Sequence, residues 1–346
     1  MVTRQDVAQR AGVSPSVVIY VLNHGPRTVA PTTRDRVLAA VRDLGYRPKS
    51  AARALRFDRI MTLGLVLPDC TNPYFTELAA SLENHAWSAG YTLLVGNSAA
   101  APERESGHIR ALLDRQVDGL LLAPAHRTQP WYASLARTGL PVVAIDREVS
   151  SRSMTHVLVD NERGAREATE HLLAHGRRRI GCLAGPPGFN PSRDRVVGWR
   201  QALEAAGLKA GSGSGGRTGW QARPAAAPLL HGVFDRGDAY RSSRALLAHD
   251  RNVDGLFVTS DEQAKGVLHA ANELGIHVPD DLTVITFDGS VDSAYTNPPL
   301  STMRQPIEHL GRTAIGRLLD RMNDPDLPPS RDVLAAQLIT RASCGC

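Results

Sequence analysis

From about residue 62 onward, short apolar runs alternate with segments whose apolar positions recur at helical spacing. Strands are predicted at 62–68, 91–97, 117–124, 141–146, 156–160, 179–185, 253–260 and 282–288. Helices are predicted at 74–89, 103–115, 162–175, 193–206, 238–249 and 261–274. Nearly continuous Val, Ile and Leu runs are typical of parallel strands buried on both faces. The alternation therefore predicts a doubly wound parallel α/β fold.

A five-residue pattern occurs twice in this region, each time before a loop and a helix. Residues 117–121 read VDGLL, and residues 253–257 read VDGLF. A match this short can arise by chance, but the shared context favours two similar lobes. A ligand of such a pair would bind between the lobes, at the carboxyl ends of the strands. Residues 207–231 are rich in Gly, Ser, Ala and Pro and predict a surface insertion.

The N-terminal piece predicts three short helices. Thr3 is a suitable N-cap for the first helix, and Gly12 is a suitable end. Ser14 then caps a second helix whose first position is Pro15, and a third helix begins near Thr32 or Thr33. Two short helices joined by a glycine-containing turn are typical of a helix-turn-helix, which reads DNA. An ordinary three-helix bundle is the alternative.

Charge favours the DNA-binding interpretation. The chain of 346 residues has a net charge of +5. Residues 1–60 carry eleven Lys and Arg against four Asp and Glu, so that this piece alone holds +7 and the rest −2. Such asymmetry indicates a polyanionic partner for the N-terminal piece. A solvated basic surface would explain the charge alone, but not the helix pattern.

Several other classes are excluded. No apolar run is long enough to span a membrane, and the first twenty residues lack the pattern of a secretory signal. Four cysteines are too few to form a disulfide framework in a chain of this length. Since disulfide frameworks are typical of secreted proteins, we expect a cytoplasmic protein. Phosphate-loop, dinucleotide and hydrolase motifs are absent, and we expect neither an enzyme nor a cofactor.

A metal site is also not expected. Cys344 and Cys346 lie in a segment without a Cys/His motif. His171 and His175 are four residues apart on a predicted helix and could bridge a metal ion, but no thiol or acidic partner is evident in the sequence. We therefore expect free thiols and surface histidines.

Short motifs follow one another in a fixed order along almost the whole chain. The N-terminal ones are Asp6-Val7-Ala8, Ala11-Gly12-Val13-Ser14, Val21-Leu22-Asn23 and Leu44-Gly45-Tyr46-Arg47-Pro48. Later ones are Asn72-Pro73-Tyr74-Phe75, Asp146-Arg147, Asp160-Asn161, Phe287-Asp288 and Gln305-Pro306. Over about residues 2–344, the chain resembles the lactose repressor/galactose repressor (LacI–GalR) family of bacterial transcription regulators.

The resemblance implies a division of the chain into three parts. These are a DNA-binding headpiece at 1–47, a hinge helix at 48–58, and a two-lobed core at 59–346 similar to periplasmic sugar-binding proteins. The chain is expected to cross between the lobes near 161, 290 and 322. Lobe one would then comprise 59–161 and 291–321, and lobe two 162–290 and 322–343.

The resemblance also assigns residues to DNA. Headpiece contacts are expected from Thr3, Ser14, Pro15, Ser16, Tyr20 and Asn23, and hinge contacts from Lys49, Ala52, Arg53, Leu55 and Arg56. Tyr20 stands where the family usually has Arg, so the operator should differ from the common family site. Leu55 matches a leucine that wedges between base pairs in the minor groove. The alternative for Leu55 is a core position of the headpiece.

Seven residues match family positions that line the ligand cleft. They are Tyr74, Phe75, Asp146, Asp160, Arg195, Phe234 and Asp288. Aromatic faces, carboxylates and a guanidinium suit a sugar or related polyol. Asp160 and Asp288 could instead cap the helices that follow them. Ser260 replaces an Asn that is frequent in the family.

Together these features predict a repressor that binds a near-palindromic operator as a homodimer and is released by a small molecule, most readily a sugar. The chain ends soon after Ser343, so the family's tetramerisation helix is not expected. The alternative is a sugar-binding protein without a DNA function, which the basic headpiece argues against.

Overall fold

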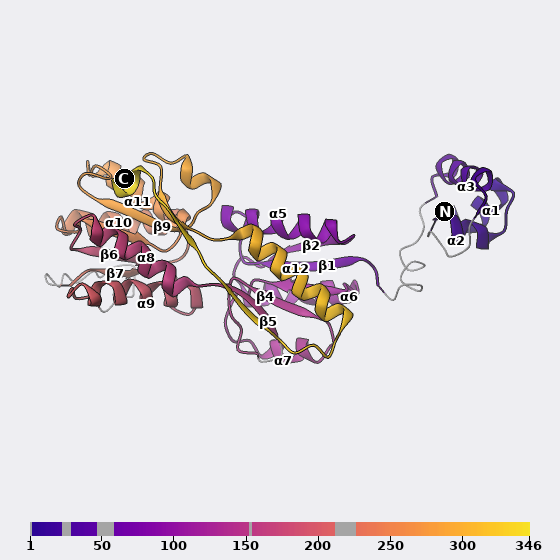
Figure 1. Ribbon diagram of the computed structural model, residues 1–346, viewed down its shortest axis with the longest axis horizontal. Helices are drawn as coiled ribbons and strands as arrows, with labels where there is room; N and C mark the ends of the chain where they lie inside the picture. The colour runs from indigo at the N-terminus through magenta and orange to yellow at the C-terminus, as the bar shows by residue number, and fades with distance from the viewer. Residues whose placement is uncertain (1, 23–28, 47–58, 152–153, 212–225) are drawn as a thin grey trace. The chain divides into compact units, whose positions relative to one another are not determined.

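The computed structural model describes residues 2–22, 29–46, 59–151, 154–211 and 226–346. The chain forms two compact units, Met1–Thr62 and Leu63–Cys346 (Figure 1). The predicted hinge at 48–58 lies outside the described residues, so the boundaries at 47 and 58 stay a prediction. Among the described residues, no helix is both long enough and apolar enough to cross a membrane.

The N-terminal unit contains the three predicted helices. They are α1 (Arg4–Ala11), α2 (Pro15–Leu22) and α3 (Pro31–Leu44). Thr3 caps α1, because its Oγ1 accepts the N–H of Asp6 at 3.3 Å while its own N–H donates to the Asp6 carboxylate at 2.7 Å. Gly12 ends α1 in the left-handed region, with φ 62°. A small core then forms from buried side chains of all three helices, Val7, Ala8, Ala11, Val18, Val21, Val37 and Ala40.

The second unit holds two six-stranded sheets. The first, in lobe one, has the order β11-β5-β4-β3-β1-β2. Its strands are β1 (Thr62–Leu67), β2 (Thr92–Asn97), β3 (Gly119–Leu122), β4 (Val142–Ile145), β5 (Thr155–Val159) and β11 (Arg331–Leu334). Strands β11, β5, β4, β3 and β1 run parallel. The predicted parallel α/β sheet is thus confirmed for this lobe.

Helices cover both faces of the first sheet (Figure 1). They are α5 (Pro73–Ser88), α6 (Pro102–Asp114), α7 (Pro130–Ala136) and α12 (Ile307–Asn323). Leu120 and Leu122 of β3 share an apolar cluster with side chains of α6 and α7. On the other face, Gly119 lets Leu318 of α12 approach the strand closely. Alternate residues of one strand thereby meet different helices, as the pleat requires.

The second sheet, in lobe two, has the order β12-β10-β9-β8-β6-β7. Its strands are β6 (Ile180–Ala184), β7 (Leu229–His231), β8 (Gly255–Val258), β9 (Thr283–Asp288), β10 (Ser301–Arg304) and β12 (Gln337–Ile339). All pairs are parallel except that between β10 and β12. The repeated VDGL pattern leads into strands β3 and β8, which begin at its glycine and occupy the same, fourth place in the order of their sheets.

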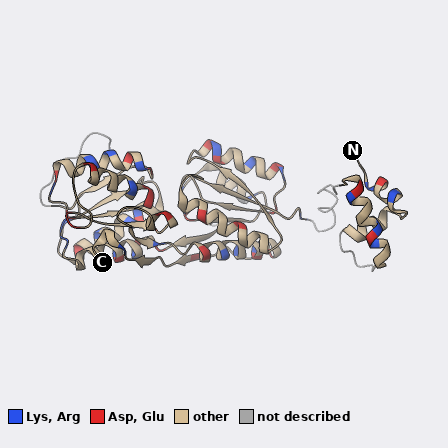
Figure 2. Ribbon diagram, turned by 90° about the horizontal axis from the view of Figure 1, so that it is seen from above, with Lys and Arg blue, Asp and Glu red and all other residues tan. Residues whose placement is uncertain are grey.

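The described residues of lobe two also form four helices and two 3₁₀ turns. They are α8 (Asn161–Ala174), α9 (Asn190–Ala205), α10 (Arg236–His249), α11 (Asp261–Glu273), η1 (Val291–Ala294) and η2 (Ala342–Cys344). Trp199 of α9 is fully buried and donates its indole N–H to the Ile180 carbonyl at 3.0 Å. Charged residues lie along the helices, whereas the strands between them carry few (Figure 2).

Two of the expected lobe crossings are wrong. The first, near 161, agrees with the passage from β5 to α8. The second follows β10 rather than residue 290, because Ser301–Arg304 pairs with β9 in lobe two. The third falls between β11 and β12 rather than at 322, because Arg331–Leu334 pairs with β5 in lobe one. Lobe two thus includes residues 291–304, and lobe one includes 323–334.

The expected insertion at 207–231 also needs correction. Its last residues, Leu229–His231, form β7 at the edge of the second sheet. Ala210 and Ala227 form an isolated bridge just before it. Residues 212–225 lie outside the described part of the chain. The insertion is therefore shorter than its composition predicted.

Candidate functional site

The surface of the headpiece presents the start of α2. Ser14, Pro15 and Ser16 are exposed there, and Tyr20 is half-buried one turn further on. Thr3 is also exposed, although its hydroxyl is used in capping α1. Asn23 and the five hinge residues, Lys49, Ala52, Arg53, Leu55 and Arg56, lie outside the described residues. The exposed beginning of a second helix is the part that enters the major groove in helix-turn-helix proteins.

A cavity of about 510 Å³ lies in the core, lined by both lobes. Lobe one contributes residues from the beginning of α5 and from the loops after β1, β2, β3 and β4. Lobe two contributes residues from α9, from the loops after β6, β7 and β8, and from Asp288 at the end of β9. These are the carboxyl ends of parallel strands, where ligands of open α/β sheets bind.

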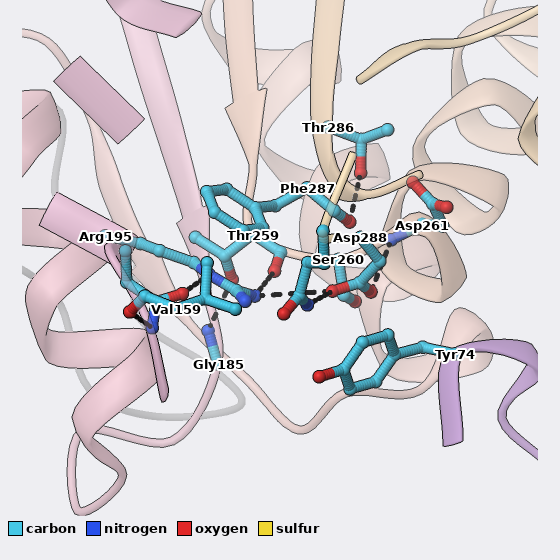
Figure 3. A network of polar contacts seen from close by, with 12 residues as sticks. Tyr74, Val159, Gly185, Arg195, Thr259, Ser260, Asp261, Thr286, Phe287 and Asp288 are labelled. Atoms are coloured by element: carbon cyan, nitrogen blue, oxygen red, sulfur yellow. Dashed lines mark hydrogen bonds and ion pairs between the residues drawn. The ribbon is translucent and has the colours of Figure 1, made fainter. Parts of the chain in front are cut away.

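Arg195 is a charged residue of the cavity lining that is held by several polar contacts (Figure 3). Its side chain is 3% exposed, and its guanidinium lies over the ring of Phe287 at 3.8 Å. Its Nε donates to Asn161 Oδ1 at 2.8 Å, and its Nη1 donates to the carbonyl of Thr259. Nη1 also lies 3.6 Å from the carboxylate of Asp288. The group is thus fixed before any ligand arrives, which limits the entropy lost on binding.

Asp288 ends β9 in an unusual conformation, with φ 119°. Its carboxylate accepts the side-chain N–H of Gln305 at 2.8 Å and the backbone N–H of Asp261 at 3.3 Å. Burial raises the pKa of Asp288, and the nearby Asp261 carboxylate acts in the same direction, whereas Arg195 opposes them. A non-glycine residue held at positive φ stores strain that persists where the surroundings over-determine it, which occurs most often at binding sites.

On the lobe-one side, Tyr74 and Asp146 form a matching pair. The Tyr74 hydroxyl donates to Asp146 Oδ1 at 3.0 Å, and both side chains are buried. Burial and the Asp146 carboxylate raise the pKa of Tyr74, so the phenol stays neutral. Asp146 also has a positive φ of 64° and lies 3.4 Å from the Nε of Arg147. A ligand hydroxyl at this place would meet a fixed acceptor.

Arg147 was not among the residues assigned to the cleft, although it follows Asp146 in a quoted motif. It is buried, donates to the Pro124 carbonyl at 3.0 Å, and lies over the Phe189 ring at 4.3 Å. The ring of Phe189 also stacks on His126, with centroids 5.8 Å apart. Both aromatic residues lie in loops that follow strands, and this position is the signal that could have identified them.

A buried carboxyl supports the loop that carries His126. Glu105 of α6 accepts the N–H of Ala125 and, at 3.1 Å, the hydroxyl of Tyr132. The same hydroxyl lies 2.8 Å from the His126 carbonyl. Burial raises the pKa of Glu105 to about 7, against the opposing effect of these hydrogen bonds. The loop is therefore held by a group that titrates near neutral pH.

The structure brings together six of the seven residues assigned to the cleft. Those that line the cavity are Tyr74, Phe75, Asp146, Arg195, Phe234 and Asp288. Asp160 does not line it, because its carboxylate caps α8 by accepting the N–H of Arg163 at 3.1 Å. Sequence reasoning missed further lining residues, among them Asp69, Asn72, His126, Arg147, Phe189 and Asp235.

Comparison with known proteins places both units in one family. Residues 3–49 match the model of bacterial regulatory proteins, lacI family, and residues 169–344 match the periplasmic binding protein-like domain. The HTH-type transcriptional repressor PurR of Shigella sonnei (strain Ss046) is 32% identical over 345 residues, 99% of this chain and 97% of that protein.

Two further similarities span nearly the whole chain. The ribose operon repressor of Halalkalibacterium halodurans is 33% identical over 341 residues, 99% of this chain and 96% of that protein. The solved transcriptional regulator CelR–cellobiose complex has a TM-score of 0.72 and 28% identity, covering 99% of this chain and 100% of that one. The chain therefore belongs to the LacI family of bacterial regulatory proteins and is a ligand-responsive transcriptional repressor.

Proposed function

We propose that this repressor binds a near-palindromic operator as a homodimer and is released when a sugar or related polyol occupies the cavity of the core. The observation that supports the proposal is that two pairs of polar side chains, each held in place by its contacts, face one cavity from opposite lobes. Arg195 and Asp288 lie on one side, and Tyr74 and Asp146 on the other. An operator on the chromosome requires a repressor that acts in the cytoplasm.

The lining favours a neutral, hydroxyl-rich ligand. Buried carboxylates accept from hydroxyl groups, and a guanidinium donates to them, with strong charge-assisted hydrogen bonds. The rings of Phe75, Phe189 and Phe234 offer apolar faces for the C–H groups of a sugar. The relatives point the same way, since one is named for a ribose operon and another was solved with cellobiose. A nucleobase, which would also stack on these rings, is the second ligand class to test.

Contacts from both lobes supply the coupling to DNA. A ligand that touches Tyr74 in lobe one and Arg195 in lobe two favours one angle between the lobes. That angle sets the spacing of the two hinges in the dimer and thereby the fit of the headpieces to DNA. Coupling free energies of this kind are typically about 1–3 kcal/mol.

At the DNA end, the start of α2 would lie in the major groove. Ser16 and Tyr20 would face base edges beside Pro15, while Thr3 and Ser14 would contact the backbone together with Asn23. Tyr20 cannot make the bidentate contact of an Arg with guanine, so we expect a different base at the corresponding position. The hinge would insert Leu55 and its copy into the minor groove, flanked by Lys49, Ala52, Arg53 and Arg56.

The dimer brings two headpieces to two half-sites. A single headpiece reads only a few base pairs, and proteins with two-fold symmetry bind operators with matching symmetry. On lobe one, Trp87 of α5 and Val95 of β2 are 71% and 53% exposed, and these two elements pack together. Large apolar side chains exposed on adjacent elements suit a contact between two copies.

The test is footprinting of the purified protein on the DNA that flanks its own gene, with and without a panel of sugars, polyols and nucleobases. We expect protection of a near-palindromic site that is lost with one of the sugars. A protein that binds a sugar but protects no DNA would favour a solute-binding role. Turnover of any panel compound, which we do not expect, would instead indicate an enzyme.

A further inference from the structure

His171 in the last turn of α8, His175 at its C-cap, and the cysteines Cys344 and Cys346 come together on lobe two, outside the cavity lining. The Nε2 atoms of His171 and His175 each lie 3.4 Å from Sγ of Cys346. Sγ of Cys344 lies 3.2 Å from the same sulfur. The sequence shows no thiol partner for the two histidines, and the structure supplies one. The partner is remote in the sequence, and only the fold brings it to α8.

The arrangement has the dimensions of a metal site. Residues four apart share one face of a helix, and the two imidazole rings have centroids 4.6 Å apart. The three candidate ligand atoms all lie within 4.8 Å of one another. Zinc bonds of ~2.0 Å to nitrogen and ~2.3 Å to sulfur at a tetrahedral angle separate the two ligand atoms by ~3.5 Å.

Both sides of the cluster are held by the fold. The histidines lie in the last turn of α8 and at its C-cap. The segment with the cysteines is anchored through Ser343, whose hydroxyl donates to the Val284 carbonyl at 2.6 Å and accepts the N–H of Ser301 at 2.8 Å. Gly345, with φ 87°, turns the chain so that the next residue returns toward the helix. The sulfur is thus presented by an anchored turn, as a preorganised ligand requires.

We propose that His171, His175 and Cys346 bind a thiophilic divalent transition metal, with Zn²⁺ the best match to two imidazoles and a thiolate. The fourth position is open to water or to the Cys344 sulfur. The ion would connect the segment that follows β12 to the end of α8, entirely within lobe two. Such a clip stabilises the lobe without taking part in the cavity, so the site does not depend on the identity of the effector.

The test uses the full-length protein without a histidine tag, kept reduced with a phosphine and titrated with Co²⁺ and then Zn²⁺. We expect one Co²⁺ per chain, with a thiolate-to-cobalt charge-transfer band and the intense visible bands of a tetrahedral ion. Zn²⁺ should displace the Co²⁺ and raise the Tm by roughly 5 °C. His171→Ala, His175→Ala and Cys346→Ser should each lose the bands and the Tm shift.

Two variants outside the cluster serve as controls. Cys70→Ser removes an exposed thiol, and His309→Ala removes an exposed histidine, and both should bind Co²⁺ as the wild type does. The Tm of each cluster variant without metal shows whether it is folded, since His175 and Cys346 are themselves exposed. Cobalt bands that persist in Cys346→Ser, or reduced wild type that takes up no Zn²⁺ beyond the cluster variants, would overturn the proposal.

Discussion

At the scale of single residues, Arg195 should carry a large share of effector affinity. Its guanidinium is held by Asn161, Thr259 and Asp288, a fork that a lysine ammonium cannot reproduce. We expect Arg195→Lys to weaken binding of the effector roughly 10- to 100-fold, which is the loss typical of one or two charge-assisted hydrogen bonds. Isothermal titration calorimetry measures this loss.

The matched control for this substitution is Arg163→Lys. Arg163 lies on α8, outside the cavity lining. Its side chain is 43% exposed to solvent and pairs with Glu167 at 3.5 Å. Its replacement should leave effector affinity within about twofold, because exposed ion pairs contribute little. Equal effects of the two substitutions would show that Arg195 does not contact the ligand.

Glu105 should make stability depend on pH. Its pKa in the folded chain is about 7, against an ordinary value of 4.5. The folded state therefore holds the proton more tightly, and the stabilisation present below pH 4.5 is lost as the pH rises to about 7. Gln keeps the hydrogen bonds of the protonated form without the charge. As the pH rises from 4.5 to about 7, the free energy of unfolding of Glu105→Gln should therefore increase by about 2 kcal/mol relative to that of the wild type.

The measurement is urea unfolding of both proteins at pH 5 and pH 8. The free energy of unfolding of the variant should exceed that of the wild type by more at pH 8 than at pH 5. Glu103→Gln, an exposed position in the same helix, should show no such change. A difference that is constant with pH would mean that the Glu105 carboxyl titrates in its ordinary range.

At the scale of elements, Gly198 allows α8 and α9 to pack closely. A Cβ at this position would lie 2.1 Å from the Glu162 carbonyl oxygen and 2.8 Å from the Arg166 nitrogen, both backbone atoms. The two helices would have to separate, so we expect Gly198→Ala to lower the free energy of unfolding by about 1–3 kcal/mol. Gly316→Ala on α12 has open space and should be neutral or slightly stabilising. Differential scanning calorimetry of both variants checks the difference.

The hinge can be tested through DNA alone. A leucine that is inserted into the minor groove stabilises the complex only where the DNA can kink at the base step that receives it. Leu55→Ala should therefore weaken operator binding by about 1–3 kcal/mol while leaving binding to random DNA nearly unchanged. Fluorescence anisotropy with both duplexes separates the two effects. An equal loss on both would assign Leu55 to the folding of the headpiece instead.

How far the sequence could predict the elements depends on their burial. The central strands β3, β4, β5 and β8 are buried throughout and appear as clear apolar runs. β11 and β12 are short, partly exposed edge strands, too short for any period to be recognised. The lobe boundary expected at 322 was misplaced because it depended on β11, whereas the one expected at 290 was misplaced because the short strand β10 was not predicted. Asp160 shows a similar limit, since one residue type serves both as a helix cap and as a ligand contact.

At the scale of the whole molecule, the excess positive charge belongs to the N-terminal segment, whereas the ligand cavity lies in the core. The first 60 residues carry +7, and the remainder carries −2. Contacts between Lys or Arg and phosphates release counterions, so the logarithm of operator affinity should fall with the logarithm of salt concentration, with a slope of roughly −5 or steeper for a dimer. A neutral sugar displaces no counterions from the cavity, so its affinity should hardly change over the same range.

Both slopes can be measured on one preparation, by anisotropy for the operator and calorimetry for the effector. A flat salt response for the operator would contradict phosphate contact by the basic headpiece. A steep response for the effector would instead indicate an anionic ligand, paired with Arg147 and Arg195, the two buried guanidinium groups of the cavity lining. The pair of slopes therefore tests the DNA end and the charge of the effector independently, before either partner has been identified by name.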